Sequence, residues 1–430
     1  MALHELSLQK FFAWFLFIIS FLFFAFYFSF DAKFQAFRYS GFLFEPHRSN
    51  KKSLLGLNQS FSNDNDRLTE YYETHKRISQ MNVSLRKISF NECVQAGYGN
   101  RLYSVLSSFL IALLTNSSLV IKWKEIESYV DLPIRVFDNN ITRDEGLSKE
   151  EFAKKFYHAN PAQSWSRTKN IEALMKTNVP EAPLRYLYHE IGPYFMEICS
   201  NPIYFSKFTY YNLVNNETIN LALEVISNKK STHIDRQEKI FKVGFEVGGN
   251  LLNRFWRPIK SIMNDVKRFK EKYFQNYFVI GFQLRFHYLN KNDTNKFISC
   301  ALEIERKYLF ENSFPKVNSF KWFIASDSQE EINGILKMYP NRTFTTNEYT
   351  LGHIVHNQQS IYRAILDVEL LSICNELIVT GGSTFGWVAA MKSLKLPMYI
   401  NGQNRMDKCL RSSLSDPPSG GQGPYASFRK

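Results

Sequence analysis

The chain has 430 residues, of which 44% are hydrophobic, and carries a formal net charge of +13. This length is too great for one hydrophobic core, so we expect two domains. The basic excess favours nucleic acid, a membrane surface or an anionic substrate as partner. Because the sequence holds no finger, helix-turn-helix or basic-aromatic repeat, it argues against nucleic acid.

The first feature along the chain is an uncharged apolar run at residues 11–30. At about 1.5 Å per residue, this run would span roughly 30 Å, the thickness of a bilayer's hydrocarbon core. The run ends in Tyr27-Phe28-Ser29-Phe30, whereas signal peptides end in small residues that allow cleavage. We therefore predict a cytosolic tail at 1–10 and an uncleaved transmembrane signal anchor at 11–30.

Acceptor sites for N-glycosylation occur along the rest of the chain. There are seven Asn-x-Ser/Thr sequons: Asn58, Asn82, Asn116, Asn140, Asn216, Asn292 and Asn341. Together with a single apolar run, they favour a lumenal body and a single-pass type II layout. Residues 31–88 are polar and charge-mixed, so we predict a stem there, with a helix over 67–80.

An N-terminal α/β domain is expected over residues 89–260. The run Gly97-Tyr98-Gly99-Asn100-Arg101 opens a helix whose apolar positions recur at helical spacing, and a strand is expected over 118–123. Asn100 and Arg101 would then face a cleft. An equally strong interpretation is that the glycines only turn the chain and that Arg101 pairs at the surface.

A C-terminal α/β domain is expected over residues 261–402. Strands are predicted at 277–285, 320–326, 342–345, 377–380 and 396–400, and helices at 329–339, 358–374 and 385–393. This alternation indicates a mostly parallel sheet. The segment 403–430 contains Pro417-Pro418-Ser419-Gly420-Gly421 and is expected to be a flexible tail.

Polar groups follow three of these strands. Arg285 ends the first, Asp327 follows the second, and a Gly-Gly-Ser-Thr turn at 381–384 follows the fourth. Ligands of open α/β sheets bind at the carboxyl ends of strands, and a glycine-rich turn into a helix offers N–H groups to a phosphate. Ser383 and Asp327 would alternatively be ordinary N-caps.

Two common nucleotide sites are excluded, because neither G-x-G-x-x-G nor G-x-x-x-x-G-K-[ST] occurs. Five cysteines in 430 residues do not make a disulfide-rich scaffold, and the absence of a C-x-x-C pair argues against a zinc site. Cys374 lies in an apolar helix and is expected to be a buried free thiol.

Four ordered segments resemble the plant xyloglucan-type (α1,2-) fucosyltransferase family. They are 97–102, Gly281-Phe282-Gln283-Leu284-Arg285, the helix at 364–372, and Ser383-Thr384-Phe385-Gly386. The resemblance covers roughly residues 90–402. Related α1,6 and protein-O enzymes carry a His-x-Arg-Arg-type motif, whereas Gln283 and Phe286 lie beside Arg285 here.

The resemblance implies a GT-B-like α/β fold, with two Rossmann-like domains facing a cleft behind the anchor and stem. It implies an inverting, metal-independent transfer of fucose from GDP-fucose to a glycan hydroxyl, most simply α1,2 to galactose, in the Golgi membrane. No cofactor and no metal are expected, and GDP-fucose is the donor substrate. The alternatives are an α1,6 or protein-O-fucosyltransferase, or a non-catalytic lumenal protein that binds nucleotide sugars or glycans.

The residues that match the family give the predicted site. Catalytic roles are predicted for Arg285, Asp327 and Asp367. Donor binding is predicted for Asn100, Arg101, Gln283, Arg285, Asp327, Ser383, Thr384 and Phe385. Without a metal ion, a cation and preorganised N–H donors must neutralise the departing diphosphate. The general base stays open among Asp327, Asp367, Glu369, His287, His353 and His356.

Overall fold

The computed structural model describes residues 67–81, 88–92, 97–136, 158–159, 186–188, 194–228, 231–286, 288–289, 293–310, 319–352, 360–400 and 409–411. Within these ranges no helix is both long enough and apolar enough to cross a membrane. The predicted tail and anchor, residues 1–10 and 11–30, lie outside the described residues.

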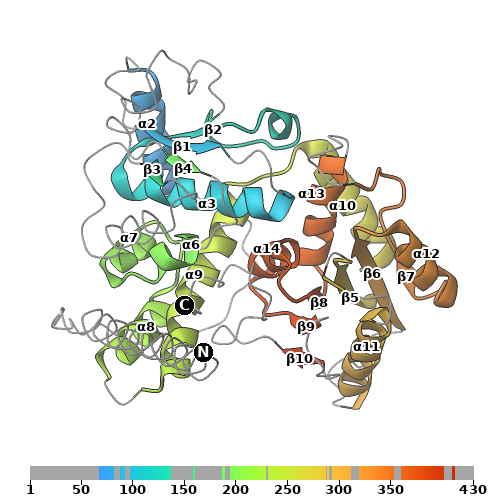
Figure 1. Ribbon diagram of the computed structural model, residues 1–430. Helices are drawn as coiled ribbons and strands as arrows, with labels where there is room; N and C mark the ends of the chain where they lie inside the picture. Colours follow the sequence, from blue (N-terminus) through green and yellow to red (C-terminus); the bar gives the residue numbers. More distant parts are fainter. Residues whose placement is uncertain are drawn as a thin grey trace, which may run out of the picture. The chain divides into compact units, whose positions relative to one another are not determined.

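The N-terminal part is built on a four-stranded parallel sheet with the strand order β2-β1-β4-β3 (Figure 1). Its strands are β1 (Ile88–Glu92), β2 (Ser118–Ile121), β3 (His158–Ala159) and β4 (Tyr186–Tyr188). Helix α3 (Tyr98–Thr115) connects β1 to β2, as expected from its apolar periodicity, and nearly all of its side chains are buried. A central helix that is buried all round fixes the position of its first turn, which reaches the candidate site.

Further helices complete this part of the molecule. They are α2 (Leu68–Ser79), the 3-10 turn η2 (Lys124–Ser128), α6 (Tyr194–Cys199), the 3-10 turn η3 (Pro202–Tyr204), α7 (Phe205–Tyr210), α8 (Asn216–Ser227) and α9 (His233–Arg254).

The predicted stem, 31–88, extends too far into the chain, because α2 belongs to the folded domain. Leu68, Tyr71 and Ile78 of α2 are buried in the domain. His75 contacts the carbonyl oxygen of Arg135 and accepts a hydrogen bond from the N–H of Leu119 in β2. These long-range contacts are the reason that a helix of polar composition is part of the domain.

The C-terminal part is a six-stranded sheet with the order β10-β9-β8-β5-β6-β7, parallel except for β10. Its strands are β5 (Tyr277–Leu284), β6 (Ser319–Ser326), β7 (Thr343–Phe344), β8 (Glu376–Thr380), β9 (Met398–Ile400) and β10 (Leu410–Arg411). Its helices are α10 (Lys260–Tyr273), α11 (Asp293–Phe310), α12 (Gln329–Met338), α13 (Ser360–Ser372) and α14 (Thr384–Ser393). The predicted α/β class and parallel sheet are thus confirmed.

Helices cover both faces of this sheet (Figure 1). Phe278, Ile280 and Phe282 of β5 point into a core with α11 and α12. Val279, between them in the sequence, packs into a second core that includes α10, α13 and α14. Successive side chains of a strand point to opposite faces, so a strand buried on both faces is a continuous apolar run.

The predicted flexible tail, 403–430, includes a segment that is part of the fold. Leu410–Arg411 forms β10 and pairs with β9, and Cys409 is joined by a disulfide to Cys300 of α11. Arg411 also donates two hydrogen bonds to the carboxylate of Glu376 in β8. Cys374 is a buried free thiol, as predicted.

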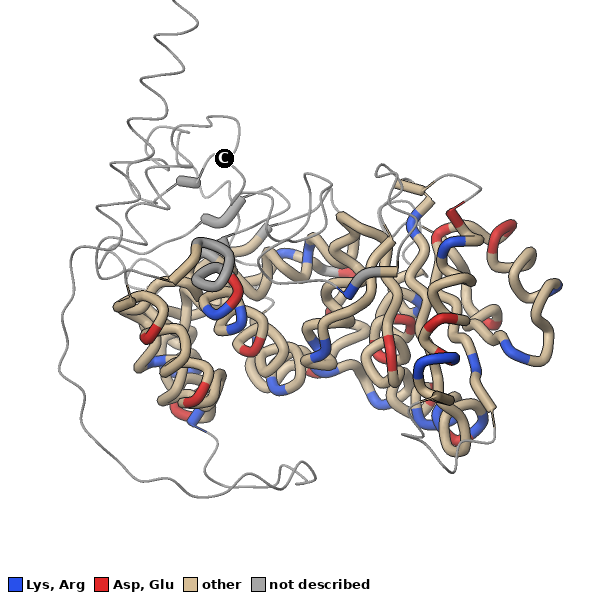
Figure 2. Tube along the Cα trace, turned by 90° about the horizontal axis from the view of Figure 1, so that it is seen from below, with Lys and Arg blue, Asp and Glu red and all other residues tan. Residues whose placement is uncertain are grey.

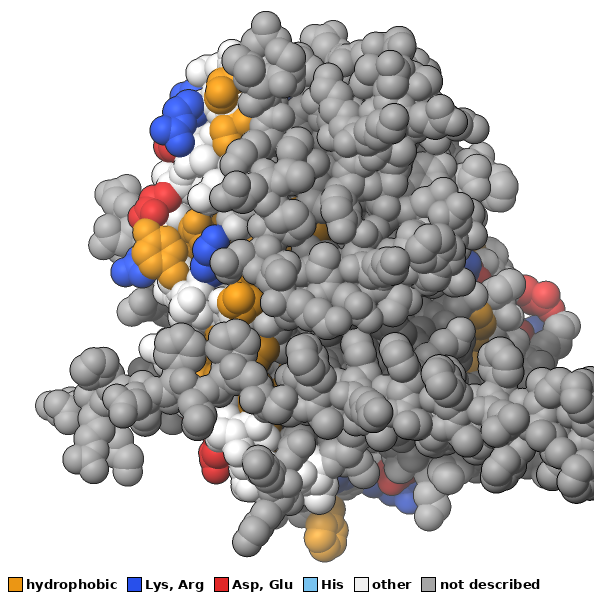
Figure 3. Space-filling model, turned by 60° about the vertical axis from the view of Figure 1, so that its left-hand side comes forward, with side chains coloured by type: hydrophobic (Ala, Val, Ile, Leu, Met, Phe, Trp, Pro, Cys, Tyr) orange, Lys and Arg blue, Asp and Glu red, His pale blue; other side chains and the backbone are white. Residues whose placement is uncertain are grey.

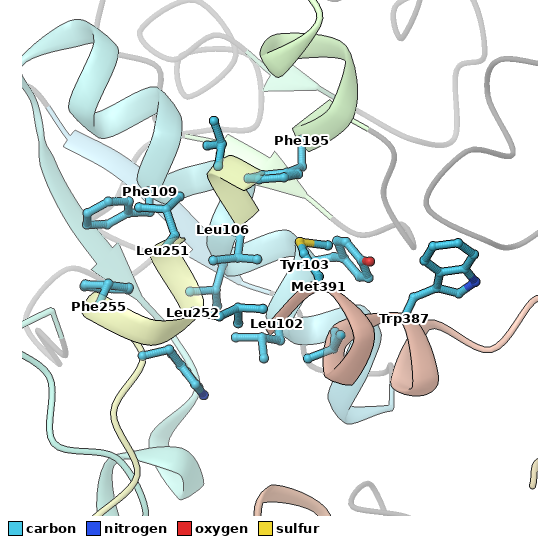
Figure 4. Packing of buried hydrophobic residues seen from close by; sticks show 14 of the residues in the cluster. Leu102, Tyr103, Leu106, Phe109, Phe195, Leu251, Leu252, Phe255, Trp387 and Met391 are labelled. Carbon is cyan, nitrogen blue, oxygen red and sulfur yellow. The ribbon is translucent and has the colours of Figure 1, made fainter. Parts of the chain in front are cut away.

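The two parts share one hydrophobic cluster, in which α3, α9 and α14 meet (Figure 4). Leu102 and Leu106 come from α3, Leu251 from α9, and Met391 from α14. The backbones of α9 and α14 approach so closely that a Cβ atom on Gly249 would lie 2.4 Å from the carbonyl oxygen of Met391. A packed core of this kind holds the ends of α3 and α14 at a fixed separation.

Charges of both signs occur on the described surface. Lys and Arg positions are interspersed with Asp and Glu positions along the helices (Figure 2). On the face drawn in Figure 3, hydrophobic, basic and acidic side chains of described residues lie next to one another.

Candidate functional site

A pocket lies where the carboxyl ends of β5 and β6 meet the first turns of α14 and α3. Most of the predicted site residues line it. Its lining residues are Gly97, Tyr98, Gly99, Asn100, Gln283, Leu284, Arg285, Tyr288, Ala325, Ser326, Asp327, Thr350, Leu351, Gly352, Ser360, Arg363, Ala364, Asp367, Gly382, Ser383, Thr384 and Phe385.

The turn between β8 and α14 presents backbone donors to this pocket. Gly382 has a φ of 78°, a left-handed conformation that favours glycine. Ser383 occupies the N-cap position, but its side chain accepts no hydrogen bond from the helix. Since the first N–H groups of a helix lack intrahelical partners, the uncapped end of α14 suits an anion.

The first turn of α3 lies directly against the first turn of α14. A Cβ atom on Gly99 would be 2.8 Å from the backbone nitrogen of Phe385 and 2.9 Å from the hydroxyl oxygen of Thr384. The Thr384 hydroxyl donates to the Asn100 side-chain carbonyl at 2.6 Å. Two segments 284 residues apart in the sequence thus form one wall of the pocket.

Arg285 is held at the end of β5 by contacts on both its backbone and its side chain. Its N–H donates to the Thr380 hydroxyl at 2.9 Å. Its guanidinium lies 2.9 Å from one carboxylate oxygen of Asp327, and the other oxygen accepts from the Phe286 N–H. Asp327 is therefore neither the N-cap of α12, which is Ser328, nor an unengaged carboxylate. It orients Arg285.

Gln283 lines the pocket and also joins the sheet to α14. Its side-chain oxygen accepts from the Thr380 N–H at 3.3 Å, and it would lie 2.7 Å from a Cβ atom on Gly386. The residue is 3% exposed. Its position supports the turn before α14, in addition to the predicted contact with the donor.

Asp367 lies in the wall formed by α13. Its carboxylate accepts a hydrogen bond from the Thr346 hydroxyl at 2.6 Å and lies 3.6 Å from Nε of Arg363. Burial raises the pKa of Asp367 to about 6, although Arg363 and Thr346 act in the opposite direction. At neutral pH this carboxyl is therefore mostly ionised, close to its titration range.

Arg363 is a pocket residue that the sequence analysis does not predict. It is 2% exposed, and its Nη1 donates to the carbonyl oxygen of Tyr349 at 3.1 Å. The sequence did contain a signal for it. Arg363 and Asp367 are four residues apart in a mostly apolar helix, the spacing of an ion pair that lies on one face.

Arg101 is the one predicted donor-binding residue that the structure does not bring into the pocket lining. It is 6% exposed, and its guanidinium lies 5.1 Å from the centre of the Trp123 ring. One residue further along a helix is a rotation of about 100°, so Arg101 points into the domain while Asn100 faces the pocket.

The remaining candidates for the general base are placed as follows. Glu369 is buried and pairs with Lys392 at 3.1 Å, away from the pocket lining. His287, His353 and His356 lie outside the described residues. Among the residues that the structure describes, no group of three or more His, Cys, Asp or Glu side chains could hold a metal ion.

No family model matches the chain, and no curated protein matches it in sequence. Among solved structures, the chain is similar to an Arabidopsis thaliana FUT1 mutant in complex with GDP, with 18% identity, a TM-score of 0.45 and 79% of each chain covered. It is also similar to the NodZ α-1,6-fucosyltransferase co-crystallised with GDP, with 16% identity and a TM-score of 0.45 over 73% of this chain and 93% of that one. POFUT1 in complex with GDP-fucose matches with 13% identity and a TM-score of 0.32 over 71% and 94%. The likeness is distant in all three.

Proposed function

We propose that this protein is a GT-B fucosyltransferase that uses GDP-fucose as donor. The main support for the proposal is that the uncapped first turn of α14 and Arg285 line the same pocket. A fixed guanidinium and oriented N–H donors in one pocket are the groups that neutralise a diphosphate without a metal ion, and this supports the proposal. The identity of the donor comes from the resemblance of residues 281–285 and 383–386 to the fucosyltransferase family.

In the proposed reaction, an acceptor hydroxyl oxygen attacks C1 of fucose with inversion. The bond from C1 to the β-phosphate oxygen breaks, and its electron pair leaves with GDP. Arg285 and the first-turn N–H groups of α14 neutralise the charge that develops on the diphosphate, so the step does not call for a metal ion. The acceptor's proton passes to a base. Asp327, whose two oxygens are both engaged, positions Arg285 instead.

For the acceptor, the proposal is a galactose-terminated glycan joined through an α1,2 linkage. It is supported by the sequence around Arg285, where Gln283 and Phe286 stand instead of the double-arginine motif of the α1,6 and protein-O enzymes.

We also propose that residues 11–30 anchor the protein in the Golgi membrane as a single-pass type II protein with its catalytic part in the lumen. The support is the uncharged apolar run and the seven sequons. Treatment with an N-glycosidase should increase the protein's electrophoretic mobility if the body is lumenal. A protein made in plant or animal cells that carries no N-glycan would contradict this layout.

The function is tested with the purified full-length chain in detergent, with GDP-fucose, EDTA and a panel of galactose-terminated oligosaccharides. The expected result is GDP release that depends on the acceptor, together with a fucosylated product whose linkage is read by methylation analysis. Binding of GDP-fucose without release for any acceptor would favour a binding protein. Failure to bind GDP-fucose would contradict the donor.

A further inference from the structure

The guanidinium of Arg363 has unused hydrogen-bonding capacity inside the pocket. Its Nη1 donates to the Tyr349 carbonyl, but Nε and Nη2 are buried and have no hydrogen-bond partner among the described residues. The nearest carboxylate oxygen, on Asp367, lies 3.6 Å from Nε, beyond hydrogen-bond length. Burying charged donors without hydrogen bonds costs free energy, so Nε and Nη2 of Arg363 are suited to acceptors supplied by a ligand.

The two unused groups form one edge of the guanidinium. The N–H of Nε and an N–H of Nη2 are nearly parallel and fork onto two neighbouring acceptors. Two kinds of acceptor pair on a nucleotide fit such a fork. One is a phosphate, and the other is the O6 and N7 edge of guanine, which arginine binds in a bidentate manner.

The charge beside Arg363 favours the base over the phosphate. The Asp367 carboxylate lies 3.6 Å from Nε, and Thr346 fixes its orientation through a hydrogen bond of 2.6 Å. A phosphate forked onto the same edge would stand beside this carboxylate, and like charges at that distance repel. The O6 and N7 atoms of a neutral base bear only partial charges, so the carboxylate repels them less than it repels a phosphate. The pocket also offers the phosphate the uncapped first turn of α14.

We infer that Arg363 is a specificity-determining residue, whose Nε–Nη2 edge binds O6 and N7 of guanine and so selects a guanine nucleotide. This inference rests on the proposed function, which supplies a GDP donor. Adenine would present its N6 amino group, a donor, where guanine presents O6, and would leave one N–H of the fork without an acceptor. Arg363 thereby discriminates at the base, whereas Arg285 acts at the diphosphate.

The test compares calorimetric titrations of the full-length chain with GDP, ADP and 7-deaza-GDP, which lacks only the N7 acceptor. For the wild type, we expect 7-deaza-GDP to bind about tenfold more weakly than GDP, and ADP about tenfold to hundredfold more weakly. Arg363→Met keeps an unbranched side chain and removes the N–H donors. In this variant the affinity for GDP should fall, and GDP and 7-deaza-GDP should bind equally well. Arg411→Met removes a second arginine with carboxylate partners, one that does not line the pocket, and should leave all three affinities unchanged.

Several outcomes would overturn the inference. Equal affinity of the wild type for GDP and 7-deaza-GDP would do so without any variant, and therefore whether or not Arg363→Met folds. The inference would also fail if GDP bound more tightly than 7-deaza-GDP by the same factor in the wild type and in Arg363→Met. It would fail too if Arg363→Met lost affinity equally for all three nucleotides, because an equal loss is the signature of a phosphate contact. If the wild type binds no GDP at all, the proposed donor is wrong as well, so the two failures are distinguishable.

Discussion

At the scale of single residues, the central group is Arg285. Its guanidinium is oriented by Asp327 and its backbone by Thr380. Lysine at this position keeps the charge but loses the planar fork that binds two oxygens. We expect Arg285→Lys to lower kcat by about 10²- to 10³-fold, the effect of removing one transition-state donor. Its melting temperature should change little, because the side chain is about one-third exposed.

The matched control is Arg411→Lys, which alters another arginine–carboxylate pair, with Glu376, outside the pocket. Turnover should stay at the wild-type value in this variant. If Arg285→Lys lost stability in proportion to its loss of turnover, or if both variants lost turnover alike, the role of Arg285 would be structural.

Asp367 gives a prediction on pH. Its pKa is about 6 in the folded protein, against 3.8 for the free side chain, because burial disfavours the charged form. Between these values the folded state keeps a proton that the unfolded state has lost, so stability falls as the pH rises from about 4 to 6 and is level above that. The size of this loss is on the order of 2–3 kcal/mol.

The measurement is the free energy of unfolding of the wild type and of Asp367→Asn from pH 4 to 7.5. The wild type should lose stability relative to the variant as the pH rises, because asparagine does not titrate. If the free energies of unfolding of the two proteins changed with pH in parallel, Asp367 would have the same pKa in the folded and the unfolded chain. That result would contradict the prediction.

Site residues at strand ends could be predicted more directly from the sequence than site residues on helices. Arg285, Asp327 and Ser383 stand at strand ends, and the carboxyl ends of parallel strands share one edge, so their grouping needs no coordinates. Arg101 and Arg363 lie on helices, where a side chain's direction depends on how the helix is rotated against its neighbours. That rotation is set by tertiary packing and is not visible in a list of polar residues.

At the scale of elements, the contact between the first turns of α3 and α14 builds the pocket. We expect Gly99→Ala to separate these turns, because its Cβ would lie within 2.9 Å of backbone atoms of Thr384 and Phe385, which cannot rotate away. Overpacking of this kind costs about 1–3 kcal/mol of stability. Since the displaced turn carries the N–H groups that we propose bind the diphosphate, the affinity for GDP should fall as well.

The matched control is Gly334→Ala in α12. Nothing lies within 4 Å of a Cβ atom at this position. Alanine there should raise the free energy of unfolding by about 0.5–1 kcal/mol through its higher helix propensity. Urea denaturation and GDP titration of both variants measure the two effects. A Gly99→Ala protein as stable and as tight-binding as Gly334→Ala would contradict the account of this wall.

Most elements of the C-terminal sheet follow from the sequence, because apolar strands and helices alternate there without interruption. Helix α11 and strand β10 are the exceptions. No element is predicted between residues 285 and 320, although Phe297, Ile298, Ala301 and Ile304 have helical spacing and are buried against the sheet. The charged residues among them lower the mean hydropathy of the helix, which conceals an amphipathic pattern from a search for apolar runs.

At the scale of the whole molecule, the disulfide between Cys300 and Cys409 closes a sequence separation of 109 residues. It joins α11 to Cys409, which directly precedes β10 and lies beyond the predicted end of the C-terminal domain at residue 402. Removing a cross-link of this span should lower the free energy of unfolding by about 2–4 kcal/mol, mainly through the entropy of the unfolded chain. Chemical denaturation of the double variant Cys300→Ala/Cys409→Ala measures the loss. A reducing agent should lower the stability of the wild type and leave that of the variant unchanged, whereas equal sensitivity of the two proteins would contradict this role.

The α/β class and the mostly parallel C-terminal sheet are predicted correctly, but the limits of the folded part are not. Composition places α2 in a stem and β10 in a flexible tail. Each is instead held by contacts with distant residues, α2 through Tyr71 and His75 and β10 through Cys409 and Arg411. Composition reports only on neighbours in the sequence, so it cannot reveal partners of this kind.

In the proposed function, the first-turn N–H groups of α14 bind the donor's diphosphate. Amide hydrogen exchange of the full-length chain, followed by mass spectrometry with GDP and with guanosine at saturation, tests this directly. We predict that GDP slows exchange in peptides that cover residues 383–386 and that guanosine, which lacks the diphosphate, does not. Binding of GDP with unchanged exchange at these amides would contradict the site.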